Sequence, residues 1–144
     1  MEIIITIKND DDTYEKLSNS KNYHDEALNE PTSMYVKFFD ENNPNYVKNN
    51  REFNLMFLKR VQTYCNDCLK AKGFLFLNDV LDELGFVKSG IGQIVGWLYK
   101  DNNLIGDNYV DFDIDNDRNA GYLNGTSDVI KLDFNVDGCI LDQI

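Results

Sequence analysis

The chain has 144 residues with 25 acidic and 14 basic side chains, which gives a formal net charge of −11. A surface of this sign repels phosphate backbones, so direct nucleic-acid binding is disfavoured and the expected partner is a protein with a basic surface. No run approaches the roughly 18 apolar residues of a membrane helix, and the start, MEIIITIKNDDD, lacks the cationic region of a signal peptide. Three cysteines, an odd number, suggest reduced thiols. These features predict a cytoplasmic protein with no membrane contact.

The length and a hydrophobic content of 42% predict a single domain, residues 1–144, in three parts. The first part, residues 1–49, is expected to be variable and to contribute an edge strand. Its β-branched residues at 2–8 favour one strand, and residues 33–39 could form a second. A helical part and a sheet part are expected to follow.

Residues 50–85 carry the pattern of a helical hairpin. Apolar residues recur at intervals of three and four along residues 50–72, and Gly73 is a typical left-handed stop. In the stretch GFLFLNDVLDELGF, Asn78 would cap a short second helix that ends at Gly85. The stripe of the long helix that is expected to face the core consists of Phe53, Phe57, Val61, Tyr64, Cys65, Cys68 and Leu69.

Residues 90–144 would form an antiparallel sheet with strands at 93–99, 109–114 and 128–136. The last two segments alternate apolar and polar residues, which is the period-2 pattern of a half-buried strand. We therefore predict an α+β fold in which an antiparallel sheet of three or more strands packs against one long helix and one short helix. The outward positions of the last two strands are mainly carboxylates.

The stretch DFNVDG begins at Asp133 and has the spacing of the first six positions of an EF-hand calcium loop. Position 12 of such a loop supplies a bidentate carboxylate, but here it is Ile144. A strand pattern leads into the motif, so Asp133, Asn135 and Asp137 would line one strand face at intervals of about 6.6 Å. A calcium ion needs oxygens that converge within about 2.5 Å. We expect an acidic strand face followed by a glycine turn, and no metal site.

Three other patterns could indicate chemistry. Cys65 and Cys68 form a C-x-x-C, but it lies inside the long helix on its apolar stripe, whereas a redox motif is expected at a helix N-terminus. The lone His24 has no neighbours that suggest a catalytic triad. The aspartates of YVDFDIDNDR could suggest a two-metal nuclease, yet they come from one strand that runs into a loop. We expect no catalytic residues and no cofactor, and hence no enzyme.

The loop at 115–127, DNDRNAGYLNGTS, is long for a connection between antiparallel strands, and long loops in compact domains are often functional. It would place Tyr122 and Leu123 beside the acidic strand face, and an aromatic anchor inside a charged rim is typical of protein interfaces. The alternative is that Tyr122 folds back to cap the core. The predicted partner-binding residues are Asp111, Asp113, Asp115, Asp117, Tyr122, Leu123, Asp133 and Asp137.

The second half of the chain contains the distinctive stretches FLFLNDVLDELGF, GQIVGWLYKDNNLIGDNYVDFDI and KLDFNVDGCILDQI, with VQTYCNDCLKAKG in support. Through these stretches, residues 74–144 resemble the C-terminal part of an uncharacterised accessory protein family of phages and conjugative elements from Gram-positive bacteria. The resemblance implies a mobile-element accessory protein in the cytoplasm of a bacterial host cell. It implies no catalytic residues.

The first functional hypothesis is a non-enzymatic inhibitor of a host defence nuclease, which acts by protein–protein binding as anti-CRISPR proteins do and mimics nucleic acid at a basic channel. The alternative is a homo-oligomeric accessory factor of the mobile element, active in assembly or replication. A metal-dependent enzyme is the third hypothesis.

Overall fold

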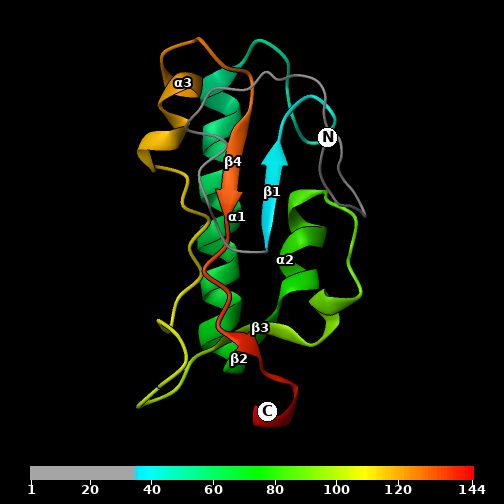
Figure 1. The fold of residues 1–144 in the computed structure, drawn as a ribbon, viewed down its shortest axis with the longest axis vertical. Helices are drawn as coiled ribbons and strands as arrows, with labels where there is room; N and C mark the ends of the chain where they lie inside the picture. The colour runs from blue at the N-terminus through cyan, green and yellow to red at the C-terminus, as the bar shows by residue number, and fades with distance from the viewer. Residues whose placement is uncertain (1–34) are drawn as a thin grey trace, which may run out of the picture. The chain divides into compact units, whose positions relative to one another are not determined.

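The computed structural model of the protein describes residues 35–144, which lie within one compact unit at residues 32–144 (Figure 1). The helices are α1 (Arg51–Lys72), α2 (Leu77–Leu84) and α3 (Ala120–Leu123), and the strands are β1 (Val36–Phe39), β2 (Phe74–Phe76), β3 (Val95–Leu98), β4 (Ile130–Asp133) and β5 (Gly138–Cys139). The predicted α+β class with antiparallel pairing is confirmed. The strand predicted at 2–8 and His24 lie outside the described residues. No helix in the described range combines the length and the hydropathy that a bilayer crossing requires.

The strands form two antiparallel sheets instead of one continuous sheet (Figure 1). In the first sheet β1 pairs with β4, and in the second β3 lies between β2 and β5. The strands predicted at 33–39, 93–99 and 128–136 are present in shortened form as β1, β3 and β4. The approach of β3 to β2 requires a glycine, because a β-carbon at Gly96 would collide with the carbonyl oxygen of Leu75.

The strand predicted at 109–114 is wrong. Asp113 has a φ angle of +59°, which interrupts extended backbone, and its amide donates a hydrogen bond of 2.8 Å to Asp111 Oδ1. The segment still contacts β4 and its continuation, because Asp133 N donates to Phe112 O and Asn135 N donates to Asp111 O, each over 3.2 Å. The alternation itself holds, since the apolar residues of the segment are all buried: Val110, Phe112 and Ile114.

Helix α1 lies within one residue of the predicted range 50–72 and ends before the predicted stop, Gly73. Asn50 Oδ1 accepts a hydrogen bond from Phe53 N, and Gly73, with φ of +84°, donates its amide to Leu69 O. The buried stripe is displaced from the prediction, however. Phe53 and Tyr64, which were expected in the core, are 40% and 51% exposed. The buried residues of α1 are Asn54, Leu58, Val61, Cys65 and Leu69.

The displaced stripe includes Asn54, a polar residue on the buried face of α1. Its Oδ1 accepts from Val47 N over 2.8 Å, and its Nδ2 donates to Val47 O over 2.9 Å and to the Tyr122 hydroxyl over 2.9 Å. A carboxamide that is satisfied in this way can be fully buried. The sequence pattern placed the neighbouring Phe53 in the core because only apolar residues were counted toward the stripe, and asparagine is mostly exposed in proteins.

Strand β2 separates α1 from α2, so the predicted helical hairpin contains a strand at its turn. Helix α2 ends at Gly85, with φ of +91°, as predicted. It begins at Leu77, and Asn78 is not its cap. The Asn78 side chain instead binds both Ser89 N and Ser89 O at 2.9 Å.

The two-point contact made by Asn54 and Asn78 recurs, and we call it an asparagine clamp: one carboxamide accepts from the N–H and donates to the C=O of a single residue. It reproduces the pair of hydrogen bonds that an antiparallel strand neighbour would exchange with that residue. In the part of the chain that the structure describes, the clamps are Asn54 on Val47, Asn66 on Val110, Asn78 on Ser89, Asn108 on Lys100 and Asn119 on Lys131.

The substitution Asn54→Ala should lower the free energy of unfolding by about 2 kcal/mol or more, because it removes three hydrogen bonds and leaves the buried Tyr122 hydroxyl without its donor. Denaturant unfolding at equilibrium measures the change. Asn42→Ala is the matched control, since Asn42 is exposed and its side chain makes no hydrogen bond within residues 35–144. A value for Asn54→Ala within about 0.5 kcal/mol of the wild type would contradict the role assigned to the clamp.

Candidate functional site

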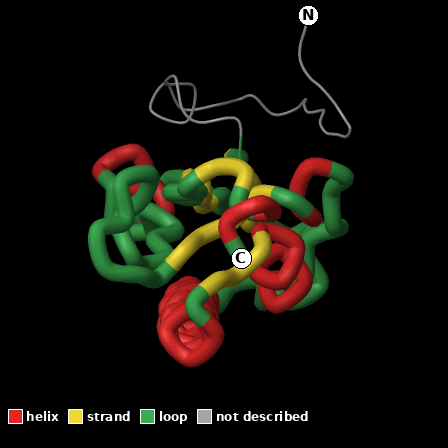
Figure 2. The backbone as a smooth tube through the Cα atoms, turned by 90° about the horizontal axis from the view of Figure 1, so that it is seen from below, coloured by secondary structure: helices red, strands yellow, loops and turns green. Residues whose placement is uncertain are grey.

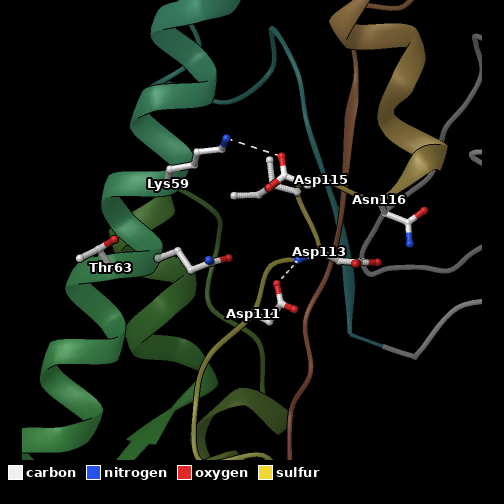
Figure 3. Close-up of a pocket in the computed structure, with 8 residues that line it drawn as sticks. Lys59, Thr63, Asp111, Asp113, Asp115 and Asn116 are labelled. Atoms are coloured by element: carbon white, nitrogen blue, oxygen red, sulfur yellow. Dashed lines mark hydrogen bonds and ion pairs between the residues drawn. The ribbon is translucent and has the colours of Figure 1, made fainter.

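A groove with a volume of about 540 Å³ runs between α1 and residues 111–116 (Figure 3). We call it the acidic groove, because three of the predicted partner-binding aspartates line it. It is lined by Lys59, Gln62 and Thr63 of α1 and by Asp111, Asp113, Ile114, Asp115 and Asn116 of the facing segment.

Two side chains of α1 hold the facing segment in place. Asn66 clamps Val110 with hydrogen bonds of 2.8 and 2.9 Å, and one turn earlier Gln62 Oε1 accepts from Phe112 N over 2.7 Å. Because Val110 and Phe112 are buried against the core, the Asp111 carboxylate between them is turned toward the groove. The outward direction predicted for Asp111 is thus kept without a regular strand.

Arg118 pairs with two of the predicted binding carboxylates. Its guanidinium nitrogens lie 3.4 Å from Asp113 Oδ2 and 3.3 Å from Asp133 Oδ2, and only 12% of its side chain is exposed. Burial raises the pKa of Asp113, and the guanidinium opposes that rise. Asp113 and Asp133 of the predicted acidic face are therefore paired within the chain. The cause is the short 3₁₀ turn Asp117–Asn119, whose last residue clamps Lys131 of β4 and so brings Arg118 to the strand.

The other carboxylates of the run remain more open. Asp115 lies 3.5 Å from Lys59 Nζ, but the two side chains are 80% and 56% exposed. An exposed pair of this kind contributes little free energy and can be exchanged for another partner. Asp111 accepts the amide hydrogen bond from Asp113 noted above, and Asp117 is exposed. The negative charge available to a visiting molecule therefore comes mainly from Asp111, Asp115 and Asp117.

Tyr122 is buried, with 1% of its surface exposed. Its hydroxyl accepts from Asn54, and the guanidinium of Arg51 lies 4.7 Å from the centre of its ring. Of the two alternatives drawn from the sequence, the structure thus has the one in which Tyr122 folds back to cap the core. Leu123, the next residue, is 59% exposed.

The three oxygen-bearing residues of DFNVDG contact three different groups. Asp133 pairs with the arginine described above, Asn135 Oδ1 accepts from Trp97 Nε1 over 2.8 Å, and Asp137 Oδ2 accepts from Leu98 N over 2.9 Å. Trp97 and Leu98 belong to β3. The spacing that resembles a calcium loop therefore fastens the chain after β4 to the neighbouring sheet.

Asp137 sits in a tight site that is separate from the residues lining the acidic groove. Its Oδ1 atom is buried without a hydrogen-bond partner among the described residues, and a β-carbon at Gly106 would collide with the carboxylate. Burial raises the pKa of Asp137, while hydrogen bonds from Leu98 and Asn103 oppose the rise and the nearby Asp107 adds to it.

The cysteines of the C-x-x-C lie on α1, as the sequence indicated. Cys65 is buried, and this burial raises the pKa of its thiol to about 12. Cys68 is partly buried, Cys139 is exposed, and all three thiols are free. Within residues 35–144, no group of three or more His, Cys, Asp or Glu side chains is placed to hold a metal ion.

The sequence patterns did not single out Arg118 or the α1 residues of the groove, Lys59, Gln62 and Thr63. A signal for Arg118 was present, because residues 101–144 contain ten acidic side chains and only two basic ones, Arg118 and Lys131. A basic residue in such surroundings is a candidate for an internal ion pair. No comparable signal marks Gln62, whose contact with Phe112 joins positions far apart in the sequence.

The chain belongs to a protein family whose function is unknown. The family DUF6353, described as a family of unknown function, matches residues 6–144. This match extends well beyond residues 74–144, where the sequence resemblance lies. The chain matches no curated protein and no solved structure.

The substitution Asp137→Asn should change how stability depends on pH. Because the folded-state pKa of Asp137 is raised above the ordinary value of 3.8, its ionised form destabilises the fold at neutral pH, and this cost disappears as pH falls through the raised pKa. The Tm of the wild type minus that of Asp137→Asn should therefore increase as pH is lowered from neutral toward 3.8.

Thermal unfolding followed by circular dichroism measures this difference. The control is Asp101→Asn, which removes an exposed carboxylate outside this site and should show no such trend. A difference between wild type and Asp137→Asn that stays constant or shrinks on acidification would show that the buried carboxylate is not destabilising.

Proposed function

We propose that this member of DUF6353 acts without catalysis, by binding a protein that presents a basic surface to the acidic groove. The observation that carries the proposal is the groove itself, which displays Asp111 and Asp115 opposite a single lysine, Lys59, on α1. An arginine or lysine of a partner could replace Lys59 beside Asp115 and also reach Asp111.

The charge around the groove supports the proposal. Residues 101–144 have a net charge of −8, from ten acidic and two basic side chains. Of the two basic residues, Arg118 pairs with Asp113 and Asp133, and Lys131 is 3% exposed. Neither side chain therefore places a positive charge on the surface beside the exposed carboxylates of residues 101–144. Such a field accelerates association with a positive surface and makes binding sensitive to salt.

The predicted binding residues take different roles in this proposal. Asp111, Asp115 and Asp117 supply contact charges, and the exposed Leu123 supplies an apolar contact nearby in the chain. The carboxylates of Asp113 and Asp133 position Arg118 and so keep the segment and β4 together. Tyr122 supports this region from inside the core.

In its more specific form, the proposal identifies the partner as a nucleic-acid-binding nuclease of a bacterial defence system, inhibited by a protein that a mobile element encodes. Support comes from the sequence resemblance to accessory proteins of phages and conjugative elements, and from the fit between negative carboxylates and a channel that normally accepts phosphates. A homo-oligomeric accessory factor is the second candidate, and the exposed apolar residues Phe53, Met56 and Tyr64 of α1 favour it.

The test is a pull-down at low salt from a bacterial host that expresses CRISPR effectors, followed by a binding titration with each purified, captured protein. We expect a partner with a nucleic-acid-binding surface whose affinity falls steeply as salt rises. The triple variant Asp111→Asn, Asp115→Asn, Asp117→Asn should lose most of this affinity.

The matched control is Asp82→Asn, Glu83→Gln, Asp101→Asn, which removes the same amount of charge from exposed residues outside the groove. This control should retain the affinity of the wild type. Equal losses in both triple variants would point to net charge rather than the groove. Absence of any nucleic-acid-binding partner at low salt would reject the inhibitor proposal.

A further inference from the structure

The solvent face of α1 carries an unusual row of side chains. Phe53, Met56 and Tyr64 are 40%, 63% and 51% exposed. Figure 2 shows α1 at one edge of the described fold, with the strands lying on one side of it. We call the row along the other side the outer stripe. Its residues follow one another at intervals of three and four along the helix, and they are Phe53, Met56, Arg60, Tyr64, Asp67 and Ala71.

Isolated exposed apolar residues are common on monomeric proteins, but a row with this spacing is the pattern of a helix–helix seam. The residues of the outer stripe lie on one face of a helix of 22 residues, which is about 33 Å long. The opposite face is already used in the core, through Leu58, Val61 and Cys65. Helix α1 therefore has a second face that is suited to a partner helix.

The charges of α1 specify what that partner can be. Helix α1 contains five basic and two acidic side chains, a net charge of +3 in a chain whose net charge is −11. Arg60 and Asp67 are both exposed and form no ion pair within residues 35–144. In a parallel pair of α1 helices, each of these charges would meet its own copy and repel it. In an antiparallel pair, each would meet the opposite charge.

We propose that two copies of the chain associate through their outer stripes, with the α1 helices antiparallel and a two-fold axis near Tyr64. In this arrangement Arg60 of each copy lies opposite Asp67 of the other, so symmetry forms both ion pairs at once. Met56 then comes opposite Ala71 of the second copy, and Phe53 lies at the C-terminal end of the partner helix.

The apolar residues of the outer stripe supply the buried area of the dimer interface, and the charged residues determine the antiparallel orientation of the two helices. Exposed ion pairs add little affinity by themselves, so the free energy comes from covering the aromatic and methionine side chains. A single pair of helices is a small interface by the standards of stable complexes. The dimer should therefore dissociate on dilution.

Charge-reversal variants distinguish the antiparallel dimer from the binding of any other partner to the outer stripe. Arg60→Asp alone and Asp67→Arg alone each create two like-charge contacts in the antiparallel dimer, and each should raise the dimer dissociation constant at least about tenfold. The double variant Arg60→Asp, Asp67→Arg restores both ion pairs with their signs exchanged, and should dimerise as the wild type does. Sedimentation equilibrium over a wide range of protein concentration measures all four constants.

Lys88→Asp and Asp82→Arg are the matched controls, since they make the same charge changes at exposed positions outside α1. Both should leave the dissociation constant unchanged. All substituted residues are exposed, and unchanged circular dichroism spectra would show that the variants are folded.

A wild type that stays monomeric at every concentration would overturn the proposal and leave the stripe to a different protein. A dimer that both single reversals leave intact, or that the double variant fails to restore, would also overturn it, because another surface or a parallel pairing would then be responsible. None of these outcomes depends on the acidic groove, so the binding function proposed above is tested separately.

Discussion

The fold depends on carboxamide side chains that take the place of missing strand neighbours. An asparagine carries an acceptor oxygen and a donor NH2 group at the end of a short side chain, so it can satisfy both backbone groups of one residue at a distance. The clamp of Asn54 on Val47 fixes the loop that leads into α1, and the clamp of Asn66 on Val110 fixes the segment that faces α1. Buried backbone groups must be paired, and these contacts pair them where the chain has only short strands.

The acidic groove is a consequence of this arrangement. A segment held by Asn66 and Gln62 does not need to be extended along its whole length, so Asp113 can adopt a left-handed conformation. The turn brings the chain back toward β4, where Arg118 pairs with Asp113 and Asp133. The contacts of Asn66 and Gln62 thus hold the segment to α1, while Arg118 compensates part of its charge and the rest stays beside a helix with a positive net charge.

Local signals in the sequence were sufficient for the C-terminal ends of both main helices, because Gly73 and Gly85 act on their immediate neighbours. The period-2 pattern also identified which residues of 109–114 are buried. It could not show that the segment is not a strand, since the competing partner, Asn66, lies on α1. The buried stripe of α1 was misplaced for the same reason: Asn54 is core only because Val47 and Tyr122 are there to bind it. Contacts of this kind join distant positions and leave no periodic trace.

Hydrogen exchange of the Val110 amide tests most directly whether a side chain of α1 replaces a strand neighbour. In the wild type, the Val110 and Phe112 amides should be protected although they lie outside any regular strand. In Asn66→Ala, the Val110 amide should exchange as an exposed loop amide does, while the Lys131 amide, held by Asn119, should keep its protection. Fast exchange of Val110 in the wild type, or protection that survives the loss of the Asn66 carboxamide, would contradict the account.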